Sequence, residues 1–169
     1  LAERMRPQNL SEYIGQEHIL GPNSGLRRAI ESGHIPSMIF WGPPGVGKTT
    51  LAQIIAQTVK RPFHQLSAIN SGVKDIREII QKASSSGFFG QQNAILFIDE
   101  IHRFSKSQQD SLLGAVEKGV LTLIGATTEN PSFEVISALL SRSQVYTLQH
   151  HTKEELLKLM NRALREDTV

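Results

Sequence analysis

Residues 42–49 read GPPGVGKT, and this stretch constrains the fold more than any other part of the sequence. It fits G-x-x-x-x-G-K-[ST], a pattern that a chain of this size meets by chance on the order of once in a hundred sequences or fewer. The apolar run SMIFW precedes it, and KTTLAQIIAQTV follows with apolar residues at helical spacing. A strand, a glycine-rich loop and a helix in that order direct backbone N–H groups and a helix N-terminus at one anion. The sequence therefore predicts a phosphate-binding loop.

Each part of this loop has an expected task. Glycines leave room for the phosphate, because a side chain would block its approach to the backbone. Lys48 is expected to reach the β- and γ-phosphates, and the Thr49 hydroxyl is expected to bind Mg²⁺. The alternative is a Gly/Pro turn that merely connects two elements. The predicted nucleotide-binding residues of the loop are Gly42, Pro43, Pro44, Gly45, Val46, Gly47, Lys48, Thr49 and Thr50.

Strand and helix patterns alternate along the rest of the chain. Strands are predicted at 63–67, 94–98, 121–126 and 144–148, and helices at 73–83, 107–119, 133–140 and 152–164. This order predicts an α/β fold with a five-stranded parallel sheet between two layers of helices, because parallel neighbours need crossover connections. The spacing places Leu51, Ile54, Ile55, Thr58 and Val59 on one face of the helix after the loop, and Leu156, Leu159, Met160, Ala163 and Leu164 on one face of the last helix.

The segment ILFIDE ends a buried strand with two acids, Asp99 and Glu100. Asp99 is expected to hold Mg²⁺ through water at the carboxyl edge of the sheet, close to the phosphate loop. Glu100 is then placed to orient or deprotonate an attacking water, which favours hydrolysis over phosphate transfer to a small metabolite. The competing interpretation is a pair of acids that simply ends a strand.

GATTENP follows the next strand, so its polar residues are expected beside the acid pair if the two strands are neighbours. Thr128 is the preferred candidate for a hydrogen bond to the γ-phosphate or the water, with Thr127 and Asn130 as rivals. A turn role competes with all three, since Thr and Asn-Pro are ordinary turn residues.

Composition excludes several other classes of function. The chain has no cysteine, so it contains no disulfide, thiolate zinc site or cysteine nucleophile. Its net charge is +2, with no basic or acidic block. No apolar run is long enough to span a bilayer, and no signal-peptide core is visible, so we expect a cytoplasmic protein. The chain begins without Met and stops directly after a helical pattern, which suggests a fragment.

Four stretches together resemble a known family: GPPGVGKT, ILFIDEIHRFSKSQQD, IGATTENPSFEV and ALLSRSQVY. They are similar to AAA+ ATPases, which have the P-loop NTPase three-layer fold, and within them to the replication-associated recombination protein A family with its eukaryotic relatives, the Werner helicase-interacting proteins. The resemblance covers essentially the whole chain. Ser105 is a mild departure, since Asn is commoner there.

The resemblance implies roles for individual residues. Tyr13, Ile14 and Gly15 lie where AAA+ proteins enclose the adenine of ATP, and Asp99 and Glu100 match the Walker B acids. Thr128 aligns best with sensor 1. Arg142 falls on the Ser-Arg-Cys position of clamp-loader relatives, with Ser143 replacing the Cys, and there the arginine reaches the ATP site of the neighbouring subunit. From the residues alone, Arg142 is a surface cation at a helix end.

The family also implies partners. Its members act as oligomers, described as tetramers, on single-stranded and forked DNA at stalled replication, and they associate with single-strand binding protein. A DNA-stimulated ATPase is therefore expected, and the alternative is an assembly switched by ATP binding rather than driven by turnover. The candidate DNA contacts are Ser71, Gly72, Lys74, Arg77, Arg103 and Lys106, although these are equally ordinary solvated residues.

The resemblance further divides the chain into an ATPase core, residues 1–150, and the first helix of a helical lid, residues 151–169. The remainder of the lid, with its sensor 2 arginine, and an oligomerisation region lie outside this sequence. ATP hydrolysis by this stretch alone is expected to be weak.

Overall fold

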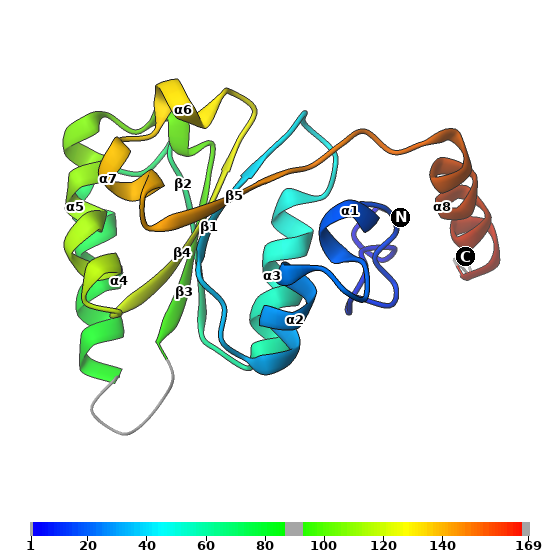
Figure 1. Cartoon of the computed structure of the whole chain (residues 1–169), viewed down its shortest axis with the longest axis horizontal. Coiled ribbons are helices and arrows are strands. Elements are labelled where there is room, and N and C mark those ends of the chain that lie inside the picture. Colours follow the sequence, from blue (N-terminus) through cyan, green and yellow to red (C-terminus); the bar gives the residue numbers. More distant parts are fainter. Residues whose placement is uncertain (1, 87–92, 167–169) are drawn as a thin grey trace.

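The computed structural model describes residues 2–86 and 93–166, and a five-stranded parallel sheet forms its centre. The strand order is β2-β3-β4-β1-β5, and every adjacent pair is parallel. Helices cover both faces of the sheet (Figure 1), so the predicted α/β three-layer fold is confirmed. The strands are β1 (Ser37–Trp41), β2 (Phe63–Ser67), β3 (Ala94–Asp99), β4 (Leu121–Thr127) and β5 (Ser143–Thr147).

The helices divide into two layers. One face of the sheet packs against α1 (Glu17–Leu20), α2 (Gly25–Ser32) and α3 (Lys48–Val59). The other packs against α4 (Val73–Ser86), the 3-10 turn η2 (Ile101–Arg103), α5 (Lys106–Glu117) and α7 (Ser137–Leu140). The short helix α6 (Pro131–Glu134) contacts α7. The last helix is α8 (Lys153–Glu166). None of the helices within 2–86 and 93–166 has the length and hydropathy that crossing a membrane requires.

Alternate residues of the central strands supply two apolar cores. In β1, Met38 and Phe40 face the α3 layer, whereas Ile39 faces the α5 layer, and all three are fully buried. Strands β3 and β4 are buried along almost their whole length. Burial of each such side chain contributes about 1.5–3 kcal/mol. The apolar character of these segments therefore reflects a sheet that is covered on both faces.

One detail of the sequence prediction is wrong. The helix expected at 133–140 is two short helices, α6 and α7, because Val135 between them has extended backbone angles. Of the residues that the spacing places on one face of α3, Thr58 is exposed, and its hydroxyl donates to the Ile54 carbonyl at 2.7 Å.

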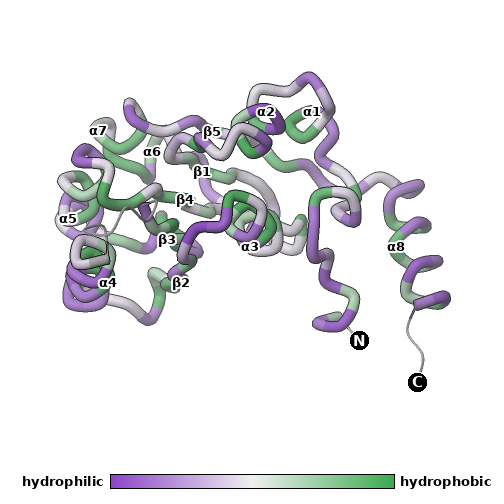
Figure 2. The backbone as a smooth tube through the Cα atoms, turned by 90° about the horizontal axis from the view of Figure 1, so that it is seen from below, coloured by the Kyte–Doolittle hydropathy of each residue, from purple (hydrophilic) through white to green (hydrophobic). Residues whose placement is uncertain are grey.

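Helix α8 stands apart from the sheet, beside the N-terminal segment (Figures 1 and 2). The predicted capping box is present: the Thr152 N–H donates to Glu155 Oε2 at 2.9 Å, and the Glu155 N–H donates to Thr152 Oγ1 at 3.2 Å. The predicted apolar face is only partly covered, since Leu156, Met160 and Leu164 are 48%, 61% and 81% exposed. On its polar side, Arg162 pairs with the Glu12 carboxylate of the N-terminal segment at 3.2 Å.

Gln109 of α5 is buried and joins the residue before α5's N-cap to the end of α6 and the connection between α6 and α7. Its Nε2 donates to the carbonyls of Phe104 and Glu134, at 3.1 and 2.9 Å, and its Oε1 accepts from the Ile136 N–H at 2.9 Å. Gln109→Leu leaves these buried groups without partners, so we expect a loss of about 2–4 kcal/mol in the free energy of unfolding. Urea denaturation measures this loss, and Gln57→Leu on the exposed side of α3 is the control. Equal midpoints for the two variants would contradict the bridging role.

Candidate nucleotide-binding site

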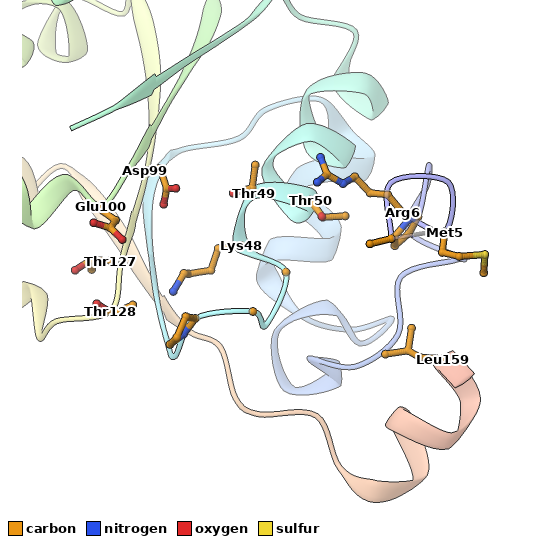
Figure 3. Close-up of a pocket in the computed structure, with 15 residues that line it drawn as sticks. Met5, Arg6, Lys48, Thr49, Thr50, Asp99, Glu100, Thr127, Thr128 and Leu159 are labelled. Carbon is orange, nitrogen blue, oxygen red and sulfur yellow. The ribbon is translucent and has the colours of Figure 1, made fainter. Parts of the chain in front are cut away.

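A cavity of about 680 Å³ lies at the carboxyl edge of the sheet, between the strand ends and the first turn of α3 (Figure 3). Parallel pairing aligns the strand ends here: Trp41 of β1 is opposite Thr127 of β4, and Ile98 of β3 is opposite Gly125 of β4. Figure 3 shows Lys48, Thr49 and Thr50 on one side and the strand ends on the other. The lining residues are Ala2, Met5, Arg6, Pro7, Pro44, Gly45, Gly47, Lys48, Thr49, Thr50, Asp99, Glu100, Thr127, Thr128 and Leu159.

Lys48 is buried in this cavity, with its ammonium enclosed by the loop. Its Nζ donates to the carbonyls of Gly42 and Pro43, the latter at 3.1 Å. Burial lowers the pKa of Lys48, and the negative charges of Asp99 and Glu100 oppose that shift. The loop therefore holds a cation that faces two carboxylates across the cavity.

The loop glycines are required for reasons that the sequence prediction did not include. A Cβ on Gly42 would lie 2.5 Å from the Leu148 carbonyl oxygen, so the chain after β5 leaves no room for a side chain. Gly47 has φ +95°, and a Cβ there would lie 2.8 Å from Tyr13 Oη. Gly45 also has a positive φ, +78°, but nothing lies within 4 Å of its Cβ position. Close packing therefore requires glycine at position 42, and close packing together with a positive φ requires it at position 47, whether or not a phosphate binds.

The three remaining loop positions, Pro43, Pro44 and Val46, have different surroundings. Val46 is buried in the core. Pro43 borders a neighbouring hollow with Thr128 and His150, while Pro44 lines the main cavity. The loop prediction therefore divides into residues that face the cavity and residues that hold the loop in place.

The acid pair lies at the end of β3. Asp99 is the last strand residue, and Glu100 follows with φ +53°, a left-handed conformation that non-glycine residues rarely adopt. Glu100 Oε2 lies 3.8 Å from Arg103 Nε. Because such backbone strain is often found at functional sites, the conformation of Glu100 is consistent with a role beyond ending a strand.

The structure separates the three candidate sensor residues. Asn130 does not line the cavity, and its side chain caps α6 by accepting from the Ser132 N–H at 3.0 Å. Thr127 is buried, and its hydroxyl contacts His102 Nδ1 at 2.9 Å and also the backbone of Glu129. Thr128 is exposed in the cavity (Figure 3). Of the three candidates, Thr128 is therefore the one whose side chain is exposed to a ligand in the cavity.

Tyr13 lies against the phosphate loop. Its hydroxyl is 3.2 Å from the Val46 carbonyl and 3.3 Å from the Gly47 carbonyl, and burial raises the pKa of this phenol. Ile14 and Gly15 line a second cavity, of about 340 Å³, together with Tyr13. The predicted adenine-binding segment is thus adjacent to the loop, in its own hollow.

Arg142 lies far from this cavity. It precedes β5, whose first residue, Ser143, is opposite Ser37, the first residue of β1. The phosphate loop follows the other end of β1, so the length of a five-residue strand, roughly 16 Å, separates Arg142 from that edge. The guanidinium pairs instead with Glu117, with 2.9 Å between Nη2 and Oε1.

The candidate DNA contacts lie at the starts of two adjacent helices. Four of them are exposed: Lys74 and Arg77 of α4, and Arg103 and Lys106 around the start of α5. The helices α4 and α5 follow neighbouring strands and pack side by side. Ser71 and Gly72 are only partly exposed, and the Gly72 N–H donates to Asp75 Oδ2 at 2.8 Å.

The sequence reasoning missed the part of the site that comes from distant segments. The cavity is also lined by Met5 and Arg6 of the N-terminal segment and by Leu159 of α8, on the side away from the strand ends (Figure 3). Arg6 was visible as a cation near the start of the chain, but nothing in its spacing connects it to residues 42–49. His102, which contacts Thr127, was also missed.

Comparison with known families gives one match over most of the chain: the ATPase family associated with various cellular activities (AAA) matches residues 38–163. Among curated proteins, Replication-associated recombination protein A of Escherichia coli strain K12 is 53% identical over 168 residues, which are 99% of this chain and 37% of that protein. ATPase WRNIP1 of Dictyostelium discoideum is 53% identical over 97% of this chain and 19% of its own length. This chain therefore spans well under half of these relatives.

Solved structures agree with this match. The Thermotoga maritima RuvB Holliday junction branch migration motor superposes with a TM-score of 0.76 at 34% identity, over 94% of this chain and 53% of that one. The resemblance found in the sequence motifs is thereby confirmed.

Proposed function

The chain belongs to the AAA family of ATPases, and we propose that it binds ATP in the cavity of about 680 Å³ and hydrolyses it. The observation that carries this proposal is the arrangement of the buried Lys48 ammonium opposite Asp99 and Glu100. A cation for the phosphates and a carboxylate for the water are the two groups that hydrolysis needs on either side of a γ-phosphate.

Mg²⁺ fits the residues that line this cavity. The Thr49 hydroxyl and the Asp99 carboxylate are both oxygen donors, which this hard cation prefers, and both line the cavity. When bound, the ion would neutralise phosphate charge. The remaining steps belong to the chain: Lys48 binds the β- and γ-phosphates, Glu100 takes the proton of the attacking water, and Thr128 donates to the γ-phosphate.

The adenine end of the nucleotide is assigned to Tyr13, Ile14 and Gly15. The contact between Tyr13 and the loop carbonyls supports this assignment, because it places the segment directly beside the phosphate site. The division into a core of residues 1–150 and a lid that begins at 151–169 is part of the same proposal. The position of α8, apart from the sheet but with Leu159 at the cavity, supports it.

The active form is proposed to be a homo-oligomer, in which Arg142 acts on the ATP site of a neighbouring copy. The separation of Arg142 from its own cavity by a whole strand supports this role. In keeping with the names of its relatives, we assign the full-length protein to replication and recombination. Its activity there is proposed to be DNA-stimulated ATP hydrolysis at stalled forks. The proposal also includes assembly into tetramers, association with single-strand binding protein, and a cytoplasmic location at the nucleoid.

DNA is proposed to bind across the starts of α4 and α5, where four exposed cations lie. In the full-length protein, replacing Lys74 and Arg77 together by Ala should weaken binding to single-stranded DNA about tenfold, because two phosphate contacts are lost. The slope of log affinity against log salt should decrease in magnitude by roughly 1.4. Fluorescence anisotropy over a range of salt measures both quantities.

The control for this experiment removes two exposed cations from other helices, Arg28 of α2 and Arg165 of α8. It should leave the DNA affinity and the salt slope unchanged. ATP hydrolysis without DNA should be the same for both double variants and the parent. An unchanged affinity and slope for the Lys74/Arg77 variant would refute this placement of DNA.

A further inference from the structure

The structure assigns to Glu117 the positioning of Arg142, an inference that rests on the proposed role of Arg142 at a neighbour's ATP site. Glu117 is the last residue of α5, and Arg142 follows α7, so their ion pair joins two separate elements. Its N···O distance is 2.9 Å. Within the described residues, Glu117 is the one carboxylate that lies within 4 Å of the Arg142 guanidinium.

The backbone of Arg142 is held independently of this pair. Its N–H donates to the Leu139 carbonyl at 3.1 Å, and the Ser143 hydroxyl donates to the same carbonyl at 2.7 Å. These bonds fix where the side chain begins but leave its long, flexible stem free to rotate. The guanidinium needs a second anchor to occupy one direction, and the Glu117 carboxylate supplies it.

Stability does not account for this ion pair. The side chains of Arg142 and Glu117 are 44% and 40% exposed, and pairs as exposed as this contribute little to folding. A carboxylate at the last residue of a helix is also disfavoured by the helix dipole. A negative charge at this position is therefore better explained by its effect on Arg142 than by its effect on α5.

The geometry of the pair leaves Arg142 able to bind a second anion. Glu117 occupies Nη2, and the Ser141 hydroxyl lies 3.4 Å from Nη1. A guanidinium has five N–H donors, so others remain for a phosphate oxygen while Glu117 stays in place. The pair thus holds the cation before a neighbour's nucleotide arrives, which reduces the ordering needed in the transition state.

Glu117→Gln tests this inference in the full-length protein, because it keeps the shape of the side chain and removes the charge. We expect kcat for ATP hydrolysis to fall about tenfold to a hundredfold, with the KM for ATP and the oligomeric state unchanged. The matched control is Glu31→Gln, which removes the carboxylate of another exposed pair, Arg27–Glu31 at 3.0 Å on α2. A parental kcat for Glu117→Gln, or loss of the oligomer in sedimentation, would overturn the inference.

Subunit mixing separates this inference from the proposed function on which it rests. Glu117→Gln chains mixed with Lys48→Ala chains should regain activity, since the intact ATP site of the first can receive a correctly held Arg142 from the second. Glu117→Gln chains mixed with Arg142→Ala chains should not, because both lack a competent arginine. Gain of activity in this second mixture would show that Glu117 does not act through Arg142. Failure of the Lys48→Ala and Arg142→Ala mixture would instead contradict the proposed function.

Discussion

Glu100→Gln is expected to lower kcat for ATP hydrolysis by about 10²–10⁴-fold in the full-length protein, while ATP binding persists. The amide has nearly the same shape as the carboxylate but accepts no proton from water at neutral pH. Lys48 and Thr49, which are expected to bind the phosphates and Mg²⁺, are untouched. Steady-state phosphate release measures the turnover, and binding of a fluorescent ATP analogue measures the affinity.

The same variant separates the two proposed modes of action. If turnover drives fork processing, Glu100→Gln should bind ATP, assemble and fail to process a forked DNA. If ATP binding alone orders the assembly, processing should continue without hydrolysis. Glu31→Gln serves as the control for a lost surface carboxylate. A parental hydrolysis rate for Glu100→Gln would show that another group accepts the proton.

Local patterns were sufficient to predict the sheet and the polar residues at its edge. Residues 94–98 are apolar without interruption because β3 is covered on both faces, so the sequence shows a buried strand directly. Asp99 is the first polar residue after that run, and parallel pairing places the end of β3 beside the end of β4. Periodicity and the order of elements therefore bring Lys48, Glu100 and Thr128 to one cavity without information about distant contacts.

Contacts between distant segments are what the sequence could not supply. The need for glycine at position 42 arises from the Leu148 carbonyl, more than a hundred residues away. Leu159 was placed on a helical face by its spacing, but spacing does not say that this residue faces the nucleotide cavity rather than a core. The partner of Arg142 is equally non-local, since Glu117 belongs to a helix on the other side of β4 in the sequence.

The position of Arg142 leads to the second large effect. Arg142→Ala in every subunit is expected to lower kcat by about 10³–10⁵-fold, the effect of an arginine that neutralises charge during phosphoryl transfer. The same change should leave ATP affinity almost intact, because Arg142 lies at the opposite edge of the sheet from the cavity of its own chain. Lys48→Ala should be inactive for a different reason, namely loss of the phosphate-binding cation inside that cavity.

Mixing these two inactive proteins tests whether the arginine and the lysine of one active site come from different chains. In a mixed oligomer, a subunit with Lys48 and without Arg142 can lie next to a subunit with Arg142 and without Lys48. That contact contains one complete site, so activity should reappear and reach its maximum near equal amounts of the two proteins. Sedimentation of the mixture confirms that both chains share oligomers. If mixed oligomers form and remain inactive at every ratio, Arg142 does not act in trans, and its pairing with Glu117 is then a surface contact without a catalytic consequence.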